Sequence, residues 1–331
     1  MSTPSDRTAS TSLAERFRRH AASLERSGRS PLYVSLMREA ADDIEAGGVV
    51  ARVFDGVEVP RGSVPALRLM AALHHLALSG RAPMELSAID DHFDDVRERL
   101  HRTVQTNDVG RAAVLYAALL WLADRHSKPV RLLEIGASAG LNLLADRYCY
   151  VIEGVELGDP SSAVRLMEPW ERGPDCDVER AAARLRILER AGCDLAPLDP
   201  TDPDDRLALL SYIWPDEPER LERTRAALDL AADGPPLVAR QDAATWLAGI
   251  EPAPPGVLTV VWQSVFRQYL TDDQWAELEA AHPGGDTVWL RMEPTWDHVR
   301  DMELTIVEAA GAAPRRLALC GDHGAPVVWK A

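Results

Sequence analysis

Along the first 126 residues, hydrophobic and polar positions follow the period of an amphipathic helix. In the segment 65–79, apolar residues recur at i, i+3 and i+4, and Gly80 follows the last of them. A charged amphipathic segment follows at 90–101, and then a long apolar segment at 109–126, which Asp108 is placed to cap. The pattern therefore predicts that the chain begins with helices.

From Pro129 onward, short apolar runs alternate with helical segments. Such alternation is typical of an α/β protein whose sheet is covered on both faces. A Gly321–Gly324 turn joins the last two apolar runs and predicts an antiparallel C-terminal hairpin at the sheet edge. The expected strands are 130–135, 185–193, 237–239, 257–262, 287–292, 316–320 and 327–329, and the expected helices are 141–147, 218–232, 272–281 and 296–309.

These patterns divide the chain into three parts. Residues 1–12 are polar and rich in Ser and Thr, and we expect them to form a flexible tail. An all-helical N-terminal cap domain is expected over 13–108, and an α/β domain over 109–331. Residues 150–176 do not fit the alternation, so we expect an insertion there, in the form of a hairpin.

Composition and charge narrow the class of function. The 331 residues carry 36 Lys+Arg against 52 Asp+Glu, a net charge of −16, which disfavours a nucleic-acid partner. Apolar runs such as 114–123 are far shorter than the about 20 residues of a membrane span, and the N-terminus has no secretory signal. A small-molecule substrate is therefore expected, with neither nucleic acid nor a membrane as partner. The oligomeric state is left open.

Cysteine and histidine spacing argues against metal and disulfide chemistry. The four cysteines include no CxxC pair, and the nine histidines include no HExxH motif. We therefore expect no metal site, and a cytoplasmic protein with reduced thiols.

The stretch 131–148 (RLLEIGASAGLNLLADRY) carries the most chemistry. An apolar strand contains Glu134 near its end, and small residues then alternate before a helical pattern: Gly136, Ser138 and Gly140. Small residues let the backbone turn tightly from strand to helix and let a ligand approach the main chain.

This ExGxSxG pattern resembles the first motif of class I S-adenosylmethionine-dependent methyltransferases. Later segments resemble further motifs of that superfamily in order: a second strand ending at Asp194, a third ending in Asp-Ala, and a fourth ending near Gln263 and Ser264. The resemblance implies a Rossmann-like, mostly parallel sheet, S-adenosylmethionine as cofactor, and Gln263 and Ser264 beside the reacting methyl group. The cofactor-binding residues it implies are Glu134, Gly136, Ser138, Gly140, Asn142, Asp194, Asp242 and Ala243.

The ribose-binding acid has rival candidates. In the superfamily this acid follows the glycine motif by about 20 residues, whereas Asp194 lies much further along the chain. Glu153 and Glu156 are therefore alternatives.

Geometry adds a polar group to the expected cleft. Gln105, Thr106 and Asn107 precede the helix 109–126, and a short connection makes that helix antiparallel to the strand 130–135. The start of the helix then lies near the carboxyl end of the strand, where ligands bind in open α/β sheets. We expect the three side chains to contact substrate, or alternatively to cap the helix.

Two other functions stay open. Gly-Ala-Ser-Ala-Gly also matches the G-x-S-x-G nucleophile elbow of α/β-hydrolases, with Ser138 as nucleophile and Glu293 and His323 as triad partners. A methyltransferase-like fold without catalytic activity, serving as a binding module, is the third hypothesis.

Over its whole length the sequence also resembles an uncharacterised family, domain of unknown function 2332. The matching segments are 104–113 (VQTNDVGRAA), 134–143 (EIGASAGLNL), 197–200 (PLDP) and 214–221 (WPDEPERL). This resemblance implies the domain layout and no reaction.

Overall fold

The computed structural model describes residues 12–58, 64–235, 237–295 and 302–330. It divides into two compact units. One comprises Met1–Gln105 and Leu207–Leu221, and the other comprises Thr106–Arg206 and Glu222–Ala331. Residues 1–11 of the expected tail lie outside the described residues, whereas Ser12 is the N-cap of the first helix and accepts a hydrogen bond from Glu15 N.

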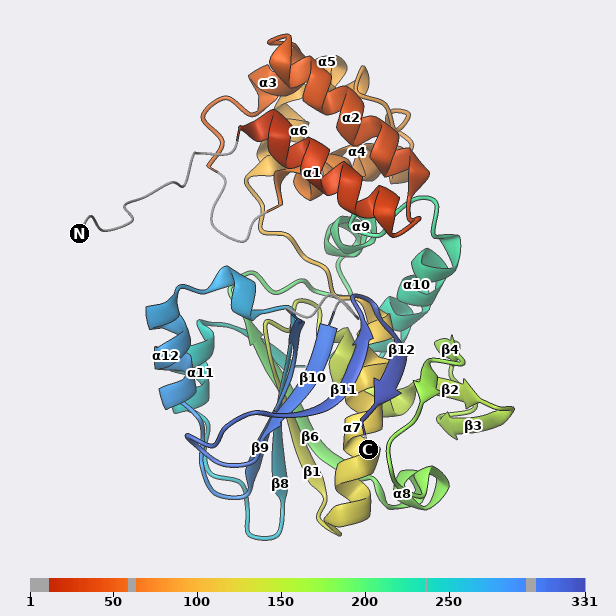
Figure 1. The fold of residues 1–331 in the computed structure, drawn as a ribbon, viewed down its shortest axis with the longest axis vertical. Coiled ribbons are helices and arrows are strands. Elements are labelled where there is room, and N and C mark those ends of the chain that lie inside the picture. The colour runs from red at the N-terminus through yellow and green to blue at the C-terminus, as the bar shows by residue number, and fades with distance from the viewer. Residues whose placement is uncertain (1–11, 59–63, 236, 296–301, 331) are drawn as a thin grey trace, which may run out of the picture. The chain divides into compact units, whose positions relative to one another are not determined.

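The first unit is helical (Figure 1). Its apolar side chains, among them Phe17, Met37 and Leu69, form one buried cluster that also takes in Trp214 from much later in the sequence. Proline occupies the first turn of two helices, where its missing N–H costs no hydrogen bond. The helices of the N-terminal segment are α1 (Leu13–Arg26), α2 (Pro31–Glu45), α3 (Val49–Val53), α4 (Pro65–Leu78), α5 (Ala88–Asp91) and α6 (Phe93–Leu100).

The second unit contains a large mixed sheet in the order β5-β12-β11-β10-β9-β8-β1-β6-β7 (Figure 1). The five neighbouring strands β7, β6, β1, β8 and β9 run parallel to one another. On the far side of β9, the strands β10, β11 and β12 continue the sheet in antiparallel pairs. The strands are β1 (Val130–Ile135), β5 (Trp170–Arg172), β6 (Ile187–Asp194), β7 (Leu237–Arg240), β8 (Leu258–Ser264), β9 (Thr287–Pro294), β10 (Met302–Val307), β11 (Arg315–Gly321) and β12 (Gly324–Trp329).

Helices pack against this sheet because its central strands are apolar on both faces. All six residues of β1 are buried. Leu133 and Ile135 pack with α11 (Ala243–Ala248) and α12 (Asp272–Ala280) in one core cluster. The other helices of the unit are η1 (Val109–Arg111), α7 (Ala112–Arg125), η2 (Leu141–Arg147), α8 (Val178–Arg184) and η3 (Arg267–Tyr269), and α9 (Pro203–Ser211) and α10 (Pro218–Ala232) each belong partly to both units.

The expected α/β architecture is confirmed, and so is the antiparallel C-terminal hairpin, because β11 and β12 pair antiparallel. Its expected place at the sheet edge is wrong, because β5 pairs with β12 and forms the edge. Within residues 150–176, β2 (Cys149–Ile152), β3 (Val155–Gly158) and β4 (Arg165–Met167) form a separate small sheet, and β5 joins the edge of the large one. No described helix has the length and apolar character needed to cross a membrane.

The predicted helix 296–309 is wrong. Residues 296–301 lie outside the described part, and β10 occupies Met302–Val307 between β9 and β11. Met302, Leu304 and Ile306 are buried in alternation, which is the period of a strand. Sheet pairing therefore overrides the helical composition of this segment. The helix expected at 141–147 is also not an α-helix but the 3₁₀-helix η2.

Candidate functional site

The candidate site lies where the central strands end. After β1 the chain adds β6 and β7 on one side, and then returns to add β8 on the other side of β1. The order of the strands therefore reverses between β1 and β8, and open α/β sheets bind ligands at the carboxyl ends of such a pair. Glu134 and Trp262 face each other in the register of this pair.

Glu134 is a buried acid with unused hydrogen-bonding capacity. Its side chain is 2% exposed, and Oε2 has no hydrogen-bond partner among the described residues. Burial raises the pKa of Glu134 well above its ordinary value, although the Asn142 side chain opposes that shift. Asn142 is itself buried, and its Oδ1 also lacks a partner in the described part of the chain. Buried polar atoms are normally paired, so this arrangement indicates a place for a ligand or water.

The turn after β1 adopts left-handed backbone conformations. Gly136 and Gly140 have φ of 67° and 72°, and Ser138 has φ of 54°. Glycine adopts this region without cost, whereas a serine there is strained and is a common feature of functional sites. Ser138 is buried, and its Oγ has no partner among the residues described. A Cβ on Gly136 would lie 2.5 Å from the ring of Phe266, so that side chain covers the turn.

Asp194 braces this turn. Its Oδ2 accepts a hydrogen bond from Ser138 N at 2.9 Å, and its Oδ1 accepts one from Ala196 N at 2.8 Å. The next strand ends beside it, because Asp194 pairs with Arg240 in the β6–β7 register. Asp242 follows that strand and caps α11 by accepting from Thr245 N at 3.0 Å. The buried Ala243 begins the helix.

The two rival acids lie elsewhere in the fold. Glu156 belongs to β3 of the small sheet, where it pairs with Arg165. Glu153 stands at the turn between β2 and β3. Asp194 is therefore the acid that the structure brings to the end of a strand beside β1.

Gln263 and Ser264 end β8, and a second buried acid faces Gln263. Glu293 Oε1 accepts hydrogen bonds from the Gln263 side chain and from the backbone N–H groups of Phe266 and Arg267, each of the latter at 3.1 Å. Burial raises the pKa of Glu293, and these hydrogen bonds oppose the shift. Gln263 Oε1 and Glu293 Oε2 are buried without a partner in the described residues.

Arg111 brings a positive charge to this edge. Its Nη1 contacts Ser264 Oγ at 3.4 Å and the Thr106 carbonyl at 3.2 Å, and its Nε contacts the Asp322 carbonyl at 3.4 Å. Its positive charge also favours the ionised forms of Glu134 and Glu293, against the effect of burial. One guanidinium therefore links the start of α7, the end of β8 and the β11–β12 turn.

The three polar residues expected before α7, which are Gln105, Thr106 and Asn107, do not share one role. Asn107 Oδ1 accepts a hydrogen bond from Leu141 N at 3.0 Å and so holds the start of η2. Thr106 contributes its carbonyl to Arg111. Gln105 is the last residue of the N-terminal segment of the helical unit.

Sequence analysis did not pair Asp108 with His323. Asp108 Oδ1 accepts from Gly110 N at 2.8 Å, and its Oδ2 lies 2.6 Å from Nδ1 of His323. The carboxylate is nearly buried, and the imidazole is 22% exposed. Nε2 of the same ring lies 3.5 Å from Asp322 Oδ2, so acids flank both ring nitrogens and fix the orientation of the imidazole. The sequence marked Asp108 as a helix cap and His323 as a triad candidate, but it assigned Glu293 as the acid of that triad.

The edge can therefore hold a cationic or polar ligand against buried acids and exchange a proton with it. Among the residues that the structure describes, no cluster of His, Cys, Asp and Glu has the arrangement of a metal site.

The fold and the site together define an α/β protein with a polar site at the switch point of its sheet. The chain belongs to a family described as "Uncharacterized protein conserved in bacteria (DUF2332)", whose model matches residues 14–329. No curated protein matches the chain.

Proposed function

We propose that this protein is an S-adenosylmethionine-dependent methyltransferase that acts on a small-molecule acceptor. The observation that carries the proposal is Glu134, a buried carboxylate with an unpartnered oxygen at the end of the central strand, directly before the glycine turn. The parallel strands β7-β6-β1-β8-β9 follow the 3-2-1-4-5 order of a doubly wound Rossmann-like sheet, which supports the same proposal.

The residues at the edge suit this cofactor. It presents an ammonium and a sulfonium group, and Glu134 offers a buried acceptor for a cation. Asp194 and Asp242 stand at the ends of the next two strands, where ribose hydroxyls and an adenine edge would find acceptors. The carboxylate oxygens of Asp194 also accept backbone N–H groups of Ser138 and Ala196, which hold this acid at the end of its strand.

When bound, the cofactor supplies an activated methyl group, so the chain itself needs to position an acceptor and exclude water. Gln263 and Ser264 lie at the end of β8, beside β1, and would orient the acceptor. His323, oriented by Asp108, would accept a proton from an acceptor that carries one at neutral pH.

The test is isothermal titration with S-adenosylhomocysteine. Micromolar binding is expected, and Glu134→Gln should weaken it by about 10-fold or more because a charged hydrogen bond is lost. Glu189→Gln, at an exposed position of β6, is the matched control and should bind as the wild type does. Asp242→Ala and Gly140→Trp should also weaken binding. A folded wild-type protein with no detectable binding would reject the proposal in favour of a binding module or a hydrolase.

A serine hydrolase is the second candidate, because Ser138 combines a left-handed backbone conformation with a buried, unpartnered Oγ among the described residues. The triad acid suggested by the sequence, Glu293, instead accepts from Gln263, and the acids beside His323 are Asp108 and Asp322. Labelling by a fluorophosphonate probe that Ser138→Ala and His323→Asn both abolish would support this candidate. An unlabelled wild-type protein would exclude it.

A further inference from the structure

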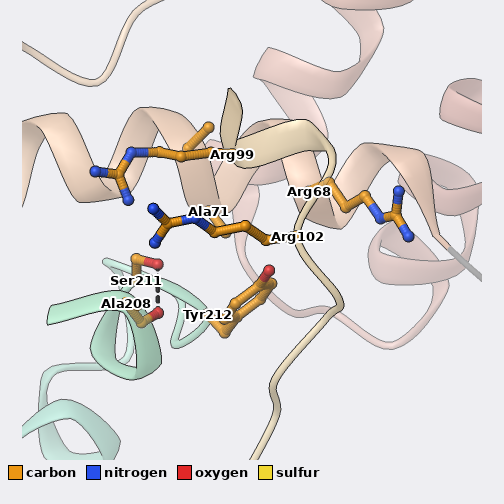
Figure 2. Close-up of a pocket in the computed structure, with 8 residues that line it drawn as sticks. Arg68, Ala71, Arg99, Arg102, Ala208, Ser211 and Tyr212 are labelled. Carbon is orange, nitrogen blue, oxygen red and sulfur yellow. Dashed lines mark hydrogen bonds between the residues drawn. The ribbon is translucent and has the colours of Figure 1, made fainter. Parts of the chain in front are cut away.

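The helical unit contains a hollow lined by arginines. Its empty volume is about 250 Å³, open solvent included, and its walls come from α4, α6 and α9 with the residues that follow the last two (Figure 2). Arg68, Arg99 and Arg102 line it together with Tyr212 and small side chains, and none of its lining residues is acidic. In a chain with a net charge of −16, such a grouping of positive charge stands out.

Two of these arginines keep donors available to the hollow. Arg99 donates from Nε to Asp95 Oδ1 at 2.9 Å, and Arg102 donates from Nη2 to Glu98 Oε1 at 2.8 Å. Each acid engages one edge of its guanidinium group, and other N–H groups remain on both arginines. Figure 2 shows both guanidinium groups on the Ser211 side of the hollow.

The third arginine has a structural role. Arg68 Nη1 donates to the Leu100 carbonyl at 2.9 Å, and in Figure 2 its guanidinium group points away from the other two. The hydroxyl groups at the hollow are also engaged, because Ser211 Oγ donates to the Ala208 carbonyl at 2.6 Å and Tyr212 donates to the Thr103 carbonyl at 3.3 Å. Arg99 and Arg102 are therefore the donors for anything that enters.

The charge of these arginines affects the pKa of a buried histidine on α4. His75 lies on the same face of α4 as Ala71 and Ala72, which line the hollow. Burial lowers the pKa of His75 to about 4, and the charges of Arg99, Arg102 and Arg81 add to the shift while Asp95 opposes it. Positive charge therefore prevails there even with the paired acids in place.

We propose that this hollow binds an oxyanion, the phosphate or carboxylate group of a small ligand, between Arg99 and Arg102. Two guanidinium groups held together repel each other, and an anion between them relieves that cost. Guanidinium groups also match phosphate and carboxylate oxygens in bidentate geometry. The site lies within the helical unit and does not depend on the methyltransferase proposal.

The experiment titrates the full-length protein with inorganic phosphate and, separately, with citrate, at constant ionic strength. Saturable binding of at least one of them is expected, and the tighter of the two identifies the ligand group. Arg102→Gln should weaken it by about 10-fold or more. Arg102→Lys keeps the positive charge but removes the planar pair of N–H donors that binds an oxyanion in bidentate geometry. An intermediate loss of affinity is expected.

Arg19→Gln is the matched control. Arg19 forms the same kind of exposed i,i+4 pair, with Glu15, on a helix outside the hollow. Unchanged binding in Arg19→Gln beside weakened binding in Arg102→Gln would support the site. The proposal fails if neither anion binds the wild-type protein saturably, or if both variants lose binding equally.

Discussion

The sheet edge of one unit and the arginine hollow of the other present groups of opposite charge. Buried acids lie at the edge, and arginines beside a buried histidine line the hollow. At the edge, burial raises the pKa values of Glu134 and Glu293, so it favours neutral acids that a cation would ionise. Beside the hollow, burial and the surrounding arginines lower the pKa of His75, so the histidine stays neutral and the positive charge belongs to Arg99 and Arg102. The two regions are therefore suited to ligands of opposite charge.

The two regions also differ in how closely their atoms are packed. Around the edge, backbone approaches backbone: a Cβ on Gly110 would lie 2.3 Å from the His323 carbonyl oxygen, and one on Gly324 would lie 2.2 Å from the Gly110 carbonyl oxygen. The hollow is lined instead by long side chains held by ion pairs, which adjust at little cost. Closely packed backbone suits chemistry that needs alignment, whereas long side chains that can adjust suit the capture of a charged group.

The largest effect on the free energy of unfolding is expected at Gly110, where two backbone segments of the edge approach each other most closely. Gly110→Ala should lower the free energy of unfolding by about 1–3 kcal/mol, because its methyl group would collide with the His323 carbonyl and displace the β11–β12 turn. Gly234→Ala is the control, since nothing lies within 4 Å of its added Cβ. Urea unfolding measures both, and equal midpoints would show that the turn yields freely.

The next effect concerns acid stability in the helical unit. Because the pKa of His75 is lowered to about 4 from 6.5, its contribution to stability is present above pH 6.5 and is lost as the pH falls through 4. The loss is on the order of 2 kcal/mol. His75→Met removes this titration, whereas His101→Met, at an exposed position, should not. Thermal unfolding between pH 4 and 7 measures the difference, and parallel curves for wild type and His75→Met would contradict it.

A smaller pH-dependent change in stability is expected at the sheet edge, where stability falls as the pH rises. The raised pKa of Glu134 means that its contribution to stability is present below its ordinary pKa and is lost as the pH rises through the raised value. Glu134→Gln should therefore stabilise the protein at pH 8 by about 1 kcal/mol and change little at pH 5. Glu189→Gln should be neutral at both. An equal shift at both pH values would mean that ionisation of Glu134 is not the cause.

The smallest effect concerns the hollow without a ligand. Arg102→Gln should change stability by less than about 0.5 kcal/mol, because its exposed pair with Glu98 contributes little. Arg19→Gln should behave the same. Whichever of phosphate and citrate binds more tightly should then raise the melting temperature of the wild type and Arg19→Gln more than that of Arg102→Gln. A large loss in Arg102→Gln without phosphate would make Arg102 a structural residue.

Periodicity was enough to predict the central strands and the C-terminal hairpin. The run that became β1 is apolar at nearly every position, as a strand covered on both faces must be. The same rule could not find β10, because its residues 303 and 305 are Glu and Thr and its neighbours carry charges typical of an exposed helix. Only pairing with β9 and β11 makes it a strand.

For the candidate site, the sequence placed Glu134 and the glycine turn at the end of a strand, and the structure shows how they lie there. It gave no sign that Phe266 covers Gly136 or that Asp108 reaches His323, since both contacts join segments more than a hundred residues apart. The arginine hollow was missed for the same reason: Arg99 and Arg102 face Ser211 only because a later segment returns to the helical unit.

That return has a consequence for how the protein is made. Trp214 completes the apolar core of the helical unit. The segment Leu207–Leu221 that carries it is translated after all the strands from β1 to β6. The N-terminal helices therefore leave the ribosome with part of their core uncovered. They stay incomplete until about two thirds of the chain has been synthesised. Domains that emerge first usually fold first, but here the first to emerge must wait for a piece that comes late.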